Sequence, residues 1–109
     1  MITWPAFIKH DGEDELIYIS SFSEWQSDEE MLLYIFTERD VLIDSTGKVF
    51  SLPVIQKNIN SDDYLAIASI ENVIELVKAH ASMSGQCCIE KINCQSIKQA
   101  VELVKDLID

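Results

Sequence analysis

The sequence has little glycine, few basic residues and no long apolar run. Its three glycines, Gly12, Gly47 and Gly85, each stand alone, so no glycine-rich loop for binding phosphate is present. The chain has no stretch of about 18 consecutive apolar residues, so we expect no transmembrane helix. The start of the chain lacks a basic segment followed by a long apolar stretch. We therefore expect no secretion signal and place the protein in the cytoplasm.

Basic residues are outnumbered, since 8 Lys and Arg stand against 19 Asp and Glu for a formal net charge of −11. Nucleic acids and anionic membrane surfaces attract Lys and Arg, so this composition argues against both as partners. Residues 1–64 carry most of the imbalance, with 13 acids and 4 bases. A solvated acidic surface explains it most simply, and a protein partner with a basic surface is the sharper alternative.

The first half of the chain has the pattern of a β-rich region. Apolar runs with aromatic and branched residues flank the acidic stretch 11–15, whose Asp-Gly pair favours a tight hairpin turn. A second hairpin is predicted over 40–55, with Gly47 at the turn position that needs a positive φ. Pro53 predicts that the second arm ends there or lies at a sheet edge.

The segment between the two hairpins predicts a short helix followed by a third strand. The spacings of Ser23 with Gln26 and of Ser27 with Glu30 are those of capping boxes. Trp25 is the expected anchor of this short helix. The apolar run 32–36, which reads LLYIF, is then predicted as a strand.

The second half changes to helical periodicity. A polar linker over 56–63 separates a β-rich part (1–55) from an α-rich part (64–109), and both are too small for separate cores, so one domain over 1–109 is expected. Ser69 and Ser96 are the predicted N-caps of two helices, with a strand over 87–92 between them and Gly85 after the first helix.

Each predicted helix has a single apolar stripe, so both are expected to pack side by side on one sheet face. The predicted fold class is therefore α+β, with a largely antiparallel N-terminal sheet of two hairpins followed by helix, strand and helix. Residues 64–68 fit either a strand or an early helical turn.

All three cysteines lie within residues 84–96, just after His80. Cys87 and Cys88 are adjacent, and Cys94 is six residues further on, which does not match the ligand spacing of a zinc site. A thiol-dependent enzyme or redox sensor would use Cys87 or Cys88 with His80 to lower the thiol pKa. The simpler interpretation is a buried strand that follows a polar histidine at a helix end, so no metal and no cofactor are expected.

Eight of the nine aromatic residues precede Tyr64. A packed core under the sheet explains most of them. The sharper hypothesis is that Trp4 or Trp25 stays partly exposed and anchors a contact surface, with the acidic residues as its polar rim.

Three stretches resemble a family of small acidic bacterial proteins that is catalogued as a domain of unknown function. They are WPAFIKHDGEDELIYISS (4–21), DVLIDSTGKVFSL (40–52) and VKAHASMSGQCCIEKI (77–92). The resemblance spans nearly the whole chain in the same order. It implies a cytoplasmic bacterial protein, and it supplies no catalytic residues because no activity is assigned to that family.

The leading functional hypothesis is a small acidic, non-enzymatic protein that binds another protein. A thiol-dependent enzyme or redox sensor, built on Cys87 or Cys88 with His80, is the alternative from a different class. A third possibility is a small-ligand-binding domain with a pocket between sheet and helices.

Overall fold

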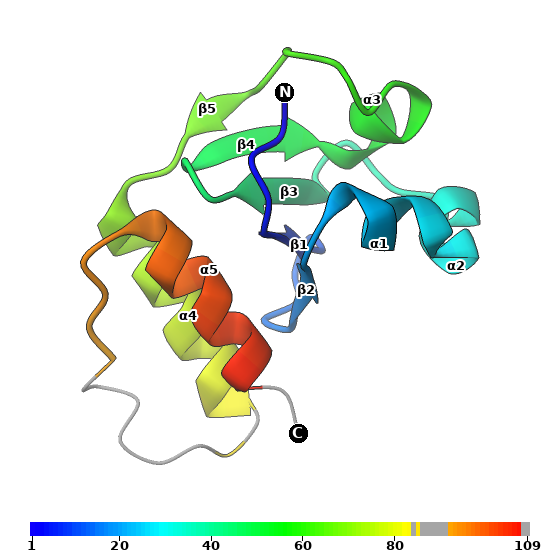
Figure 1. Cartoon of the computed structure of the whole chain (residues 1–109). Helices are drawn as coiled ribbons and strands as arrows, with labels where there is room; N and C mark the ends of the chain where they lie inside the picture. The colour runs from blue at the N-terminus through cyan, green and yellow to red at the C-terminus, as the bar shows by residue number, and fades with distance from the viewer. Residues whose placement is uncertain (84, 86–91, 108–109) are drawn as a thin grey trace.

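The computed structural model describes residues 1–83, 85 and 92–107 (Figure 1). In chain order the elements are β1 (Ala6–Lys9), β2 (Leu16–Ile19), α1 (Phe22–Ser27), α2 (Glu29–Leu33), β3 (Val41–Asp44), β4 (Lys48–Ser51), α3 (Leu52–Lys57), β5 (Ala66–Ile67), α4 (Ile70–Met83) and α5 (Ile97–Asp106). Within these ranges the strands form one antiparallel sheet in the order β2-β1-β3-β4-β5. The predicted α+β class is confirmed, and the strand predicted over 87–92 lies, except for Ile92, outside the described residues.

Both predicted hairpins are present. β1 pairs with β2 around the turn that contains Gly12, and β3 pairs with β4 around the turn that contains Gly47. Gly47 has a φ of 91°, and a Cβ added there would lie 2.7 Å from the carbonyl oxygen of Ala68 and 2.8 Å from Cδ1 of Ile97. Both the backbone conformation and the close approach therefore require glycine at this turn.

The sheet lies between two apolar layers. α4 and α5 lie side by side on one face, as predicted, and pack against Phe7 and Ile43 (Figure 1). α1 and α3 contribute to the layer on the other face, where Ile8 is buried. The main members of that second core are Ala6, Leu42, Phe50, Trp25, Leu52 and Ile55. Successive side chains of a strand point to opposite faces, so adjacent residues such as Phe7 and Ile8 enter different cores.

Asp44, at the end of β3, is fully buried and holds the β3–β4 turn and the N-terminal segment together. Its Oδ1 accepts hydrogen bonds from the Thr46 backbone N–H (2.9 Å), the Thr46 hydroxyl (2.6 Å) and the Lys48 N–H (3.0 Å). Its Oδ2 accepts from the Thr3 N–H (3.0 Å). A buried carboxylate needs such donors, and these four satisfy it.

The short helical region is confirmed, but its caps differ from the predicted ones. The N-cap of α1 is Ser21, which accepts from the Glu24 N–H, and that of α2 is Asp28, which accepts from the Met31 N–H. Asp28 also ends α1, so two short helices meet at one residue. Trp25 is buried on α1, as its predicted role of anchor requires.

The strand predicted over 32–36 is wrong. α2 continues to Leu33, and residues 34–36 have no regular structure. The Gln56 side chain donates to backbone carbonyls of this run, including those of Leu32 and Tyr34, which would otherwise be free to accept from a neighbouring strand. The apolar side chains of this run are mostly exposed.

The helix α3 was not predicted, and it shortens both the second hairpin arm and the polar linker. β4 ends at Ser51, which confirms the first of the two interpretations of Pro53. Pro53 then lies in the first turn of α3, where a missing N–H costs little. Residues 64–68 contain the two-residue strand β5, not a helical turn, and β5 pairs antiparallel with β4.

The predicted caps of the two long helices are confirmed. The Ser69 hydroxyl accepts from the Asn72 N–H, and the Ser96 hydroxyl accepts from the Gln99 N–H. Gly85 follows α4 with a φ of 74°. Across the described residues, neither these helices nor the shorter ones combine the length and the apolar character that crossing a membrane requires.

Candidate functional site

His80, on the last turn of α4, is buried with 3% of its surface exposed. Its Nδ1 accepts a hydrogen bond from the backbone N–H of Leu16 at 3.0 Å. This bond joins α4 to the first residue of β2, 64 residues away in the chain. Accepting at Nδ1 requires the neutral ring to carry its proton on Nε2. The histidine is therefore a buried link between helix and sheet, not a polar residue at an exposed helix end.

Acidification is expected to destabilise the protein through His80. Burial lowers the pKa of its imidazole below 6.5, and the nearby charge of Glu15 opposes this shift. The unfolded chain then binds the proton more readily than the folded chain. The stability that neutral His80 contributes is present above the unfolded-state pKa of 6.5 and is lost as the pH falls through the folded-state pKa.

Urea denaturation of the wild type and of His80→Asn, between about pH 7.5 and about pH 5, measures this effect. The asparagine side chain offers an amide oxygen near the position of Nδ1 and does not titrate. The wild type should lose more stability than the variant over this range. Equal losses in the two proteins would contradict the prediction.

The thiol hypothesis names Cys87 or Cys88 with His80, and of these three the structure describes His80. Cys87 and Cys88 lie outside the described residues. Cys94 is buried, and burial raises the pKa of its thiol, which disfavours the reactive thiolate. Among the described residues no group of His, Cys, Asp and Glu side chains is placed to hold a metal ion.

The two tryptophans have different surroundings. Trp25 is 3% exposed and belongs to the core beneath the sheet, so it offers no contact surface. Trp4 is partly exposed, as one of the two was predicted to be. It lines a hollow of about 290 Å³ together with Met1, Ile2, Phe22, Ile59 and Asn60.

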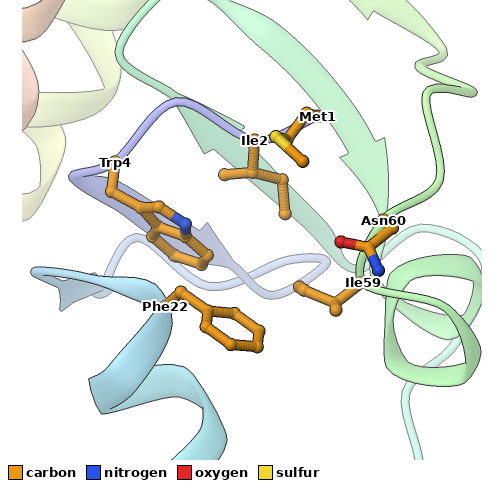
Figure 2. A pocket seen from close by; sticks show the side chains of 6 residues that line it. All are labelled: Met1, Ile2, Trp4, Phe22, Ile59 and Asn60. Atoms are coloured by element: carbon orange, nitrogen blue, oxygen red, sulfur yellow. The ribbon is translucent and has the colours of Figure 1, made fainter.

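Figure 2 shows the six side chains around a common space, with Trp4 and Phe22 on one side and Ile59 and Asn60 on the other. At its rim the N-terminal ammonium of Met1 forms an ion pair with Asp62. Most of the lining is apolar, and the Asn60 amide provides a polar group. The hollow suits a small apolar group, since its six lining side chains include no titratable or nucleophilic group.

A second surface feature is a run of four exposed apolar residues, which we call the apolar segment: Leu32, Leu33, Tyr34 and Ile35. Leu33 is 82% exposed and Ile35 is 90% exposed. Exposed apolar residues that occur singly are common on proteins, whereas contiguous ones mark interaction sites. The composition of this run favours a strand, and nothing in the sequence indicates that its side chains are exposed.

Gln56 on α3 fixes the backbone of the apolar segment. Its amide nitrogen lies within hydrogen-bonding distance of the carbonyl oxygens of Met31 (3.0 Å), Leu32 (3.1 Å) and Tyr34 (2.7 Å). The last carbonyl oxygens of a helix lack N–H partners within the helix. At the end of α2 the Gln56 amide is the donor to these oxygens. The segment is thus held against the body of the protein while Leu33 and Ile35 stay exposed.

Ring contacts made by Tyr34 also hold the apolar segment in place. The ring centroids of Tyr34 and Phe36 lie 4.8 Å apart. His10 stacks on Phe36 at 5.8 Å and packs against Tyr34 in a tilted arrangement at 5.3 Å. The His10 Nδ1 lies 3.6 Å from Oδ1 of the buried Asp40. Tyr34 therefore anchors the segment to the β1–β2 hairpin, which limits its freedom to collapse onto the surface.

The sequence profile of DUF4144, described as a protein structure with unknown function, matches residues 4–104. The chain belongs to the DUF4144 family. The resemblance inferred from three stretches of the sequence is thereby confirmed as membership in a family of unknown function.

One solved structure extends the comparison. This DUF4144 chain is similar to the protein from Shewanella amazonensis in an NMR structure, with a TM-score of 0.73 and 23% sequence identity over 100% of this chain and 92% of that one. At this identity the likeness establishes the fold alone. No curated protein matches the chain.

Proposed function

We propose that the protein is a non-enzymatic interaction module that binds another protein through the apolar segment. The observation that carries this proposal is the exposure of four consecutive apolar side chains on a backbone fixed by Gln56. Binding through a preorganised surface loses less conformational entropy than binding through a mobile one. The fold therefore maintains an apolar surface that water disfavours and that a partner would cover.

The other two functional hypotheses have weaker support. The hollow at Trp4, with about 290 Å³, is where a small-ligand domain would place its ligand, and it is near the lower end of the range of about 300–1,000 Å³ for ligand pockets. The thiol hypothesis requires His80 beside Cys87 or Cys88, which lie outside the described residues. What the structure gives for His80 is a link to the sheet, since its Nδ1 accepts the Leu16 N–H.

The test compares the wild type with Leu33→Ser/Ile35→Ser in a pull-down from native lysate of the source cells. A protein retained in stoichiometric amount by the wild type should be lost with the double variant. Both side chains are exposed, so the free energy of unfolding should change by no more than about 0.5 kcal/mol per substitution. Urea denaturation checks this, so that lost binding is not confused with lost folding.

A matched control is Ile67→Ser, which removes one apolar side chain, 63% exposed, from the edge strand β5 and is compared with the single variant Ile35→Ser. This control should retain the partner. Loss of the partner with the control and not with the segment variant would move the interface to β5. If the wild type retains nothing at low and at moderate salt, the proposal is wrong.

A further inference from the structure

We infer that the partner presents an amphipathic segment whose apolar side chains cover the apolar segment and whose Lys or Arg side chains pair with the carboxylates beside it. This inference rests on the proposed function and adds the chemistry of the partner. It starts from the position of three exposed acids relative to the four apolar residues.

Two of these acids share a helix face with the apolar segment. Glu29 precedes Leu33 by four residues, and Glu30 precedes it by three, and both spacings place side chains next to each other on a helix. Both glutamates are exposed. Acids in the first turn of a helix also favour its dipole, which explains why they are tolerated here. A partner that covers Leu33 would thus meet carboxylates at the same time.

The third acid follows the apolar segment in the chain. Glu38 follows Ile35 by three residues and is exposed. It lines a shallow hollow with Lys57 and Val54, and Arg39 is the neighbouring base in the chain. Among the described residues, the ion pairs are Met1–Asp62, His10–Asp40 and Lys78–Glu75, and none uses Glu29, Glu30 or Glu38. The carboxylates around the segment therefore remain available to a cationic partner.

The same charges argue against other occupants. A second copy of the chain would bring another net charge of −11 and the same three acids to the interface. Like charges placed opposite one another disfavour that contact and steer the protein toward oppositely charged surfaces. Nucleic acid is anionic as well, and it offers no aliphatic groups for Leu33 and Ile35. A basic, amphipathic protein segment satisfies both the charge and the apolar surface.

Three synthetic peptides of equal length test this inference by titration of the ¹⁵N-labelled, full-length protein in NMR. One combines Leu and Lys in an amphipathic helix, one replaces Lys with Glu, and one replaces Leu with Ser. The Leu/Lys peptide should shift the amide resonances of residues 29–38, and the other two should not. Its affinity should fall as salt is raised, since salt screens exposed charges.

Two charge variants make the test specific. Glu29→Gln/Glu30→Gln should weaken binding of the Leu/Lys peptide about three- to tenfold, the range expected for two exposed ion pairs. Glu102→Gln/Asp106→Asn removes the same charge from exposed positions on α5, which covers the other face of the sheet, and should weaken it less than about twofold. This control separates a local contact from attraction to the net charge of the whole protein.

Three results would overturn the inference. In one, the Leu/Glu peptide binds residues 29–38 as tightly as the Leu/Lys peptide, so the partner is not basic. In another, the Ser/Lys peptide binds equally well, so the apolar side chains contribute nothing. In the third, the Leu/Lys peptide shifts resonances elsewhere or none at all. These results concern the chemistry of the partner. In each case the proposed function would still hold if the pull-down partner were lost with Leu33→Ser/Ile35→Ser.

Discussion

Replacing Phe50 with alanine is expected to lower the free energy of unfolding by about 3–5 kcal/mol, a large share of the stability of a small domain. Phe50 is fully buried on the side of the sheet covered by α1 and α3, and its ring contacts Tyr64 edge-on at 6.4 Å. Truncation removes the apolar burial and leaves a cavity that strands on both sides prevent from closing, since β4 lies between β3 and β5.

Urea denaturation followed by circular dichroism measures this loss. Phe22→Ala is the matched control, because it deletes the same ring from a position that is 43% exposed. The control should cost less than about 1.5 kcal/mol, since roughly half of that ring contacts water already. If Phe50→Ala were no more destabilising than Phe22→Ala, the second core would not contribute as described.

Asp44→Ala is the second substitution with a large expected effect, about 3–4 kcal/mol, because three backbone N–H groups and one hydroxyl lose the buried carboxylate that accepts from them. The N–H groups belong to Thr3, Thr46 and Lys48. No neighbouring chain segment replaces the lost carboxylate without moving the turn. Equilibrium denaturation gives the total loss, and amide hydrogen exchange shows which residues become exposed.

Asp44→Asn separates the two functions of this carboxylate. The asparagine oxygen, placed at Oδ1, still accepts from Thr46 and Lys48, but the amide nitrogen at the Oδ2 position is a donor and cannot accept the Thr3 N–H. The loss should be about 1–2 kcal/mol, with faster exchange confined to the N-terminal segment. Equal losses for alanine and asparagine would mean that the turn bonds contribute little.

The sequence predicted those parts of the fold that depend on local signals. Asp11 with Gly12, and Gly47 in the second turn, mark hairpins because few residues adopt the backbone conformations that such turns need. The long helices were predicted because their apolar residues recur at helical spacing and Ser69 and Ser96 supply caps. In these segments, local preference and tertiary packing favour the same structure.

The errors arose where tertiary contacts determine the structure of an apolar run. Residues 32–36 favour a strand by composition, but Gln56 donates to the carbonyls of Leu32 and Tyr34. α3 was missed because the prediction took Pro53 as the end of a strand. Proline in the first turn of a helix was the signal that could have identified it.

The candidate site could be predicted less well than the fold. The sequence does not decide between Trp4 and Trp25 as the partly exposed tryptophan, and the structure gives Trp4. The burial of His80 is not predictable either, because a histidine near a helix end gives no indication of its partner 64 residues away. The sequence shows that the residues of the apolar segment are apolar. Whether they are exposed depends on how the whole chain folds. No pattern in the sequence alone distinguishes an exposed apolar run from a buried one.

A sheet covered by apolar layers on both sides discriminates poorly between alternative strand alignments. If β3 slid by one residue against β1, Leu42 and Ile43 would exchange cores, and nearly the same apolar area would be buried. Asp44 opposes this slip, because its carboxylate would leave the Thr3 N–H and enter an apolar layer. Gly47 opposes the corresponding slip of β3 against β4, which would place a Cβ-bearing residue in the turn. Mispaired, aggregation-prone chains are therefore expected from substitutions in this turn more than from conservative changes in either core.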